Sequence, residues 1–191
     1  MTWLKPPGPA APGLRIGLLG GSFNPAHEGH IYASLLALRQ LRLDYVWWLV
    51  TPGNPLKPAA PPLAERMGGA RLVARHPRIV VSDAESVLGT RYSIDTLVAL
   101  QRRFPVAQFV WIMGSDNLRI FRRWRRWREI AARVPIAVVR RPGSALAALP
   151  FRGMGLSLLM LDGARSRLSS TALREGLGGR GAPMLNPPLA S

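Results

Sequence analysis

The sequence contains no cysteine among its 191 residues. This absence excludes disulfide bonds, thiolate nucleophiles and every cysteine-ligated zinc site. It also gives no indication of an oxidising compartment, so we expect a cytoplasmic protein.

Long apolar runs are also missing. No stretch of 18 apolar residues is free of charge, which argues against a transmembrane helix. The first residues, MTWLKPPGPAAPG, hold too much proline and glycine for the apolar helix of a signal peptide. We therefore expect no membrane partner, a flexible leader over residues 1–13, one domain over residues 14–175 and a flexible tail over residues 176–191.

Acidic residues are few. Ten Asp and Glu stand against 26 Lys and Arg, which gives a net charge of +16. Such a charge attracts anionic partners, whether nucleic acid, a membrane surface or a small phosphorylated substrate. The few carboxylates are scattered, and no acid–base dyad is evident among them.

Short apolar runs alternate with longer amphipathic stretches. The runs predict buried strands over residues 14–19, 45–50, 79–82, 108–113, 136–139 and 156–161. The amphipathic stretches predict helices over residues 29–41, 63–75, 93–103 and 117–132. Alternating strands and helices with short connections predict a doubly wound, mostly parallel α/β sheet, which binds ligands at the carboxyl ends of its strands.

The most informative segment, residues 20–30 (GGSFNPAHEGH), follows the first predicted strand and opens the first predicted helix. Gly20 and Gly21 allow the backbone to approach a ligand closely, and the helix N-terminus offers N–H groups to a phosphate. His27 and His30 share one face of the first turn. Two imidazoles there suit the charge that builds during phosphoryl or nucleotidyl transfer. Alternatively, the histidines only cap or pack the turn.

Other ligand-binding motifs do not fit this segment. The zinc-protease helix needs its two histidines four residues apart, whereas His27 and His30 are three apart, so no metal ligand is assigned. The chain also has neither a Gly-Lys-Ser phosphate loop nor a Gly-x-Gly-x-x-Gly fingerprint.

A second anion-binding helix start is predicted near the C-terminus, at residues 167–174 (RLSSTALR). Hydroxyl groups of Ser169, Ser170 and Thr171 would cap a helix, and Arg174 would face the same phosphate. A purely structural cap is the alternative. Two such starts in one α/β chain favour shared phosphate binding.

These two segments resemble the signature of the nucleotidylyltransferase superfamily, a Gly-Gly-Thr/Ser-Phe-Asp/Asn-Pro turn with His-x-Gly-His and a distant Ile-Ser-Ser-Thr-x-x-Arg. Three interior segments resemble bacterial nicotinate-mononucleotide adenylyltransferases in particular. They are residues 90–97 (TRYSIDTL), residues 113–118 (MGSDNL) with Phe121 and Trp124, and residues 138–143 (VVRRPG). One departure is Leu56 before Lys57, where many members have histidine.

The resemblance implies a Rossmann-like fold. It also implies an adenylyltransferase that joins the AMP part of ATP to nicotinate mononucleotide, with Mg²⁺ held mainly by ATP phosphates. The implied catalytic residues are His27, His30, Lys57 and Arg174. The implied ATP-binding residues are Gly20, Gly21, Ser22, Phe23, His27, Gly29, His30, Gly114, Asp116, Ser169, Ser170, Thr171 and Arg174. The implied mononucleotide-binding residues are Asn24, Lys57, Tyr92, Ser93, Trp124 and Arg125.

The same residues are also compatible with other substrates and other roles. One alternative is that the acceptor is nicotinamide mononucleotide or phosphopantetheine. Another is that Trp124, which lies at helical spacing from Ile120 and Trp127, is an ordinary core residue. Six arginines among these tryptophans are also typical of single-stranded nucleic-acid binding. A homo-oligomer is compatible with the same basic segment.

Overall fold

A six-stranded sheet forms the centre of the molecule in the computed structural model, which describes residues 7–53, 61–140, 151 and 153–163. The strand order is β3-β2-β1-β4-β5-β6, and every neighbouring pair is parallel. The strands are β1 (Arg15–Gly21), β2 (Tyr45–Val50), β3 (Ile79–Ser82), β4 (Gln108–Gly114), β5 (Ile136–Val139) and β6 (Leu158–Leu161). The predicted doubly wound parallel sheet is confirmed.

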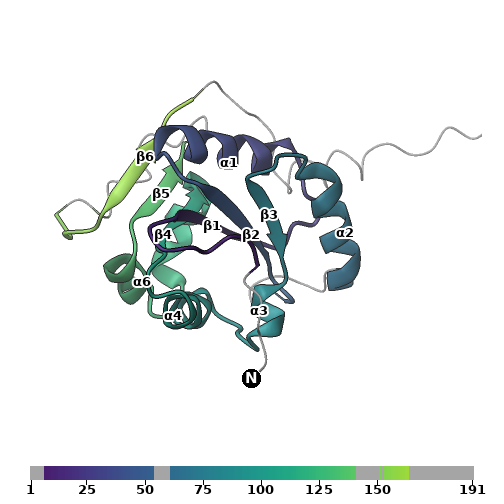
Figure 1. Cartoon of the computed structure of the whole chain (residues 1–191). Coiled ribbons are helices and arrows are strands. Elements are labelled where there is room, and N and C mark those ends of the chain that lie inside the picture. The colour runs from purple at the N-terminus through teal and green to yellow at the C-terminus, as the bar shows by residue number, and fades with distance from the viewer. Residues whose placement is uncertain (1–6, 54–60, 141–150, 152, 164–191) are drawn as a thin grey trace, which may run out of the picture.

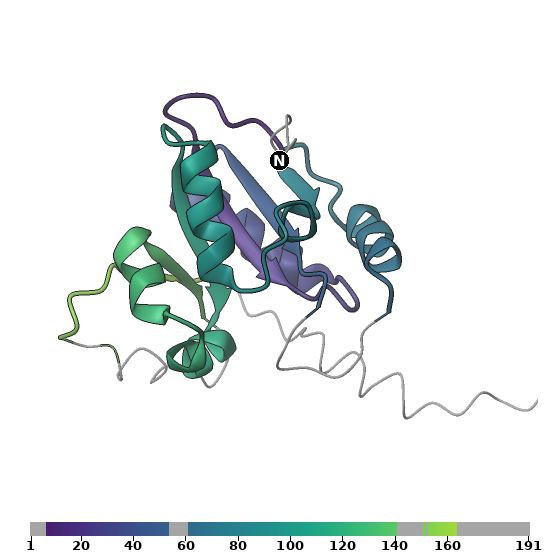
Figure 2. The ribbon, with the colours of Figure 1, turned by 90° about the horizontal axis from the view of Figure 1, so that it is seen from below.

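Helices cover both faces of this sheet. In Figure 1, α1 (Glu28–Gln40) lies above the sheet, and α4 (Ser93–Arg103) and α6 (Trp127–Arg133) lie below it. Figure 2, seen from below, shows α4 crossing the face of the sheet. The other elements are α2 (Leu63–Val73), α3 (Ala84–Val87), α5 (Ser115–Ile120) and the 3₁₀ turn η1 (Phe121–Arg123). Within the described residues, no helix has the length and apolar character to cross a membrane.

Alternating side chains along each strand build two hydrophobic cores. On β2, Trp47 packs in the core shared with α4 and α6, and the next residue, Trp48, packs in the core shared with α1 and α2. This follows from the two-residue period of a strand. Both indoles are 0% exposed. Because both faces are covered, β2 is apolar along its whole length, and the continuous run YVWWLV was readable as a buried strand.

The predicted elements agree with the structure except in two places. Three strands and α4 have the predicted bounds, and the other strands differ by one or two residues at one end or, for β1, at both ends. The short helix α3 was not predicted. The single helix predicted over residues 117–132 is wrong, because the chain forms α5, η1 and α6 there.

The break between η1 and α6 has a local cause. Trp124 is extended (φ −72°, ψ 141°), and Arg126 is left-handed (φ 50°). A left-handed non-glycine residue costs about 1–2 kcal/mol. Phe121 and Trp127 meet across the break with ring centroids 5.7 Å apart, and both side chains are buried. We infer that this aromatic packing offsets the backbone energy, which helical spacing in the sequence does not reveal.

Candidate active site

The switch point of the doubly wound sheet, where the strand order reverses, lies between β1 and β4. These strands pair from Arg15 opposite Gln108 to Leu19 opposite Ile112. Beyond that point β1 stays paired with β2 as far as Gly21, and β4 stays paired with β5 as far as Gly114. The carboxyl ends of the two central strands therefore separate. Ligands of such sheets bind at this switch point.

The glycine turn, residues 20–25 at the end of β1, lies on one side of this switch point. A Cβ atom on Gly20 would lie 3.2 Å from the Trp111 indole, which is closer than most side chains tolerate. A glycine therefore fits the end of β1 against β4. Phe23, in the turn itself, is buried with a φ of 46°, and Asn24 and Pro25 are joined by a cis peptide bond.

The two histidines cap the start of α1 reciprocally. The Gly29 N–H donates to His27 Nδ1 at 3.0 Å, and the His27 N–H donates to His30 Nδ1 at 3.2 Å. A ring nitrogen that accepts a hydrogen bond carries no proton, so each neutral imidazole has its proton on Nε2. The capping role weighed as an alternative is thus present. In this cap each ring accepts through Nδ1, so Nε2–H is the donor atom of each ring.

Aromatic packing fixes the orientation of these rings. The His27 and His30 ring centroids are 4.0 Å apart, and His30 lies 4.6 Å from Phe23 and 5.7 Å from Trp48. Trp48 donates from Nε1 to Ser34 Oγ at 2.8 Å. His27 is only 6% exposed. Both imidazoles are therefore held in place before any ligand binds, as electrostatic catalysis requires.

The end of β4 lies on the other side of the switch point. Gly114 is the N-cap of α5 and has an extended backbone, and Ser115 behind it is fully buried. Asp116 lies in the first turn of α5 and is exposed. Its predicted role near the ATP ribose stays a prediction.

The structure brings together several residues predicted to bind the mononucleotide. The Arg125 guanidinium lies 4.7 Å from the centre of the Tyr92 ring, and Tyr92 is the N-cap residue of α4, just before Ser93. Trp124 is half-buried and meets Trp111 edge-on at 6.1 Å. Since Trp111 also adjoins Gly20, one indole connects the predicted stacking tryptophan to the glycine turn.

Several predicted site residues lie outside the described residues. They are Lys57, Ser169, Ser170, Thr171 and Arg174, together with Leu56 and the end of the VVRRPG segment. Their roles stay predictions.

Two buried polar residues near the strand ends were not predicted. Arg66 on α2 is 4% exposed, and Glu85 on α3 is 5% exposed. Arg66 had a detectable signal, because it lies on the buried stripe of α2 with Met67 and Ala70. For Glu85 the only signal in the sequence was its position after a predicted strand.

Burial raises the pKa of Glu85 to about 7, although hydrogen bonds from the Thr51 and Thr96 side chains lower it. Because the pKa of Glu85 is higher in the folded protein than in the unfolded chain, protonation of this side chain stabilises the folded protein. The stabilisation is complete below the unfolded pKa and is lost as the pH rises through about 7.

We therefore expect the free energy of unfolding to fall by about 1 kcal/mol from this group between about pH 6 and about pH 8. Glu85→Gln, which stays neutral, should lack this part of the pH dependence. Urea unfolding of both proteins at the two pH values measures it. Equal pH dependence in the two proteins would assign the titration to other groups.

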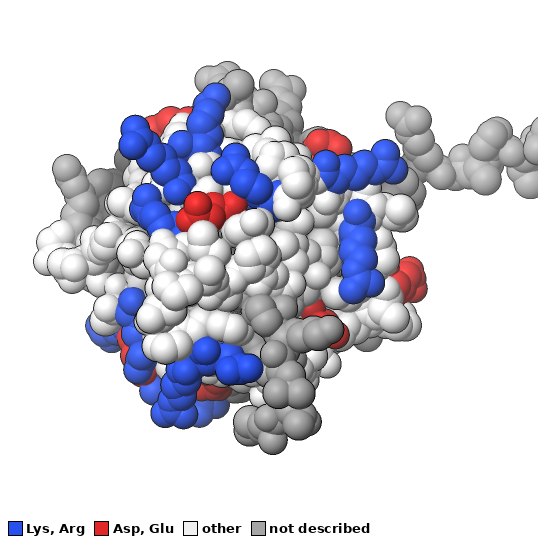
Figure 3. Space-filling model, viewed as in Figure 1, with Lys and Arg blue, Asp and Glu red and all other residues white. Residues whose placement is uncertain are grey.

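The arginine-rich segment is partly engaged within the molecule. Arg126 pairs with Glu129 at 2.6 Å and with Asp95 at 3.6 Å, and Arg128 lies 4.8 Å from the Trp127 ring centre. Figure 3 shows the basic side chains of one face in several separate groups rather than one continuous band. Neither arrangement favours the nucleic-acid alternative.

Comparison with known proteins places the chain in a family. The cytidylyltransferase-like family matches residues 18–176. A probable nicotinate-nucleotide adenylyltransferase of Parvibaculum lavamentivorans is 50% identical over 186 residues, covering 86% of this chain and 92% of the relative. One of the same name from Methylorubrum extorquens strain PA1 is 51% identical over 183 residues, covering 84% and 99%.

Solved structures show the same fold. The Plasmodium falciparum nicotinic acid mononucleotide adenylyltransferase complexed with NaAD superposes with a TM-score of 0.73 at 16% identity, covering 85% of this chain and 83% of that one. From the matches in sequence, we conclude that the chain belongs to the cytidylyltransferase-like family and, within it, to the nicotinate-nucleotide adenylyltransferases.

Proposed function

We propose that this chain is an adenylyltransferase that joins the AMP part of ATP to nicotinate mononucleotide, giving deamido-NAD and pyrophosphate in NAD biosynthesis. The supporting observation is the pair of Nε2–H imidazoles fixed at the start of α1, beside the switch point between β1 and β4. The relatives that are about half identical to this chain carry the name of the same activity.

The reaction is an in-line attack of the mononucleotide 5′-phosphate on the α-phosphorus of ATP. A bond forms between the acceptor oxygen and this phosphorus, and the bond to the β-phosphate oxygen breaks, releasing pyrophosphate. Because the acceptor phosphate is already anionic near neutral pH, no general base is needed. Catalysis then rests on positioning and on donors that meet the developing charge.

The two histidines supply such donors in this proposal. His27 and His30 donate from Nε2 to phosphate oxygens of ATP, because each Nδ1 already accepts a backbone N–H. Lys57 and Arg174 add positive charge from segments outside the described residues. Asp116 faces the ribose, and Trp124 stacks on the pyridine ring.

Magnesium enters this proposal as part of the substrate, MgATP. The ion prefers oxygen ligands, whereas the described turn offers imidazole nitrogens. Among the described residues, no group of three or more His, Asp or Glu side chains is placed to hold a metal. In this proposal the phosphate oxygens of ATP provide most of its ligands.

Pyrophosphate release by the purified protein tests this function. We expect release with MgATP and nicotinate mononucleotide, and little release when nicotinamide mononucleotide or phosphopantetheine replaces it. Activity with phosphopantetheine alone would keep nucleotidyl transfer and reject the proposed acceptor. Release with none of the three would contradict the proposed function, and oligonucleotide binding at several salt concentrations would then test the alternative.

A further inference from the structure

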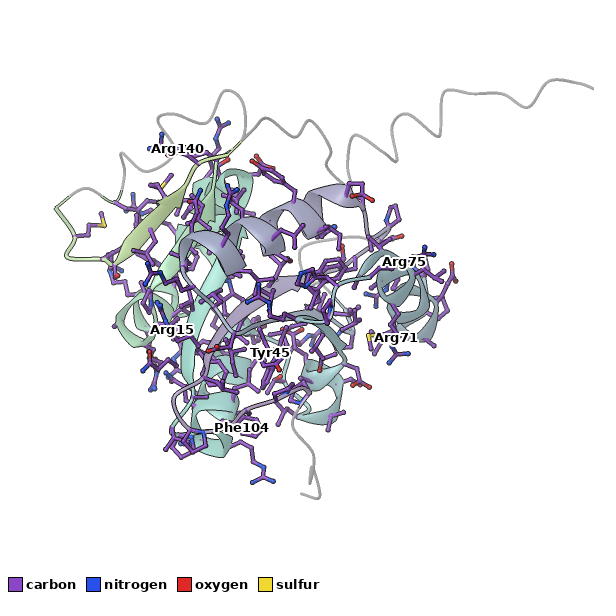
Figure 4. All side chains as sticks on the ribbon, turned by 45° about the horizontal axis from the view of Figure 1, so that its top comes forward. Arg15, Tyr45, Arg71, Arg75, Phe104 and Arg140 are labelled. Atoms are coloured by element: carbon purple, nitrogen blue, oxygen red, sulfur yellow. The ribbon has the colours of Figure 1, made fainter. Side chains whose placement is uncertain are left out.

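A buried cation lies behind the active-site loops. Arg66 extends from α2 and is 4% exposed, whereas Arg71 on the same helix and Arg75, just after the helix, lie at the edge of the molecule in Figure 4. Burial lowers the pKa of the Arg66 guanidinium. Among the described residues, no carboxylate forms an ion pair with it.

Backbone carbonyl groups satisfy this guanidinium. Nη1 donates to Ser22 O at 2.7 Å and to Thr51 O at 2.8 Å. Nη2 donates to Pro52 O at 3.2 Å, and Nε donates to Pro61 O at 2.9 Å. One side chain therefore joins the glycine turn after β1 to the loop after β2 and to the residues before α2.

Arginine suits this position better than any other side chain. Its five N–H donors lie in one rigid plane, whereas the lysine ammonium is compact and has three. Burial of an unpaired charge is unfavourable, and carbonyl groups carry only partial negative charge. Since no carboxylate neutralises Arg66 among the described residues, its positive charge persists beneath the loops.

The joined loops are the ones on which the proposed reaction depends. Ser22 belongs to the predicted ATP-binding turn, and the Thr51 N–H also donates to Gly21 O at 3.0 Å. The chain continues from Pro52 towards Lys57, the predicted phosphate contact. Reacting phosphates must meet in line, so the separation of these loops affects the rate.

We propose that Arg66 is a positioning residue for adenylyl transfer. It sets the backbone of the glycine turn at Ser22 against the loop at Thr51 and Pro52, and it places a fixed positive charge beside the anionic substrates. This role rests on the proposed function. The hydrogen bonds of Arg66 go to backbone carbonyl groups, so the residue acts through the loops.

Three variants test this proposal. Arg66→Met removes the charge and all four hydrogen bonds, and Arg66→Lys keeps the charge without the planar fork. Met67→Ala is the matched control, because Met67 is a 5% exposed neighbour on α2 that packs in the core. We measure Tm, kcat and KM for each substrate, and the Kd of MgATP by titration.

We expect Arg66→Met to raise the Kd of MgATP and both KM values about tenfold, because it removes a positive charge that attracts anionic substrates and the hydrogen bonds that hold the two loops together. Arg66→Lys should raise them less, and Met67→Ala should lower Tm with unchanged KM and Kd. If the Arg66 variants lower Tm but leave KM and Kd unchanged, the residue is structural and the proposal is overturned.

The two proposals fail in different ways. A wild-type protein without activity on nicotinate mononucleotide contradicts the proposed function, and the Kd of MgATP still tests Arg66. If Arg66→Met does not fold, Arg66→Lys decides, and unchanged KM and Kd in that variant overturn the positioning role.

Discussion

Replacing His30 by asparagine should lower kcat about 100- to 1000-fold, the usual effect of removing one donor that meets transition-state charge. The asparagine Oδ1 can take the place of Nδ1 and accept the His27 N–H, which His30 accepts at 3.2 Å. The variant therefore keeps the helix cap and loses the Nε2 donor. Steady-state kinetics at saturating substrates, with Tm measured in parallel, gives both quantities.

Glutamine at the same position is the matched control. Its amide N–H reaches towards the former Nε2, but it has no acceptor at the position of Nδ1. We expect His30→Gln to keep more activity than His30→Asn. Because it lacks the capping acceptor, its free energy of unfolding should be about 1 kcal/mol lower than that of the wild type. If His30→Asn keeps full activity, His30 acts only as a structural cap. Alanine would not separate the two roles, because it removes both atoms and the ring that packs against Phe23 and Trp48.

Replacing Trp124 by alanine should raise the KM for nicotinate mononucleotide about 30-fold and leave the KM for ATP nearly unchanged. Stacking of a planar ring on an aromatic side chain contributes about 1–3 kcal/mol. Trp124 is suited to it, because it is half-buried and both of its ring contacts among the described residues, with Trp111 and Phe121, are T-shaped. Neither neighbour covers its ring face to face.

Trp124→Phe provides the control for this prediction. A phenyl ring still stacks, so we expect the KM of this variant to lie between those of the wild type and Trp124→Ala. If Trp124→Ala lowers Tm and leaves the mononucleotide KM unchanged, the residue belongs only to the core that Trp127 and Phe121 form. Helical spacing alone had suggested that interpretation.

Strands were easier to predict than the helical segment after β4. Tyr45–Val50 and Ile136–Val139 are buried on both faces, so each forms a continuous apolar run with clear ends. No glycine or proline marks the break between η1 and α6. That break depends on contacts between Phe121, Trp127 and Phe151, and Phe151 is distant in the sequence.

The residues of the site could be predicted from the sequence, whereas their geometry could not. His27 and His30 were identified from their spacing and from the glycines before them. That each Nδ1 accepts a backbone N–H depends on side-chain rotamers, which spacing does not reveal. The partners of Arg66 were hidden for another reason, since Ser22 is 44 residues away and contributes only a carbonyl oxygen. The roles of Lys57 and residues 169–174 stay predictions.

The strand order also determines when the active site can assemble during synthesis. β1 is the first strand to leave the ribosome, yet its partner β4 begins only at Gln108. Until then Ile16 and Leu18 border an unpaired edge, and the switch point beside the glycine turn is incomplete. Long-range parallel pairing is slow to form and leaves apolar edges open to aggregation. Nascent chains that stop before β4 should therefore depend on chaperones and be unable to bind nucleotide.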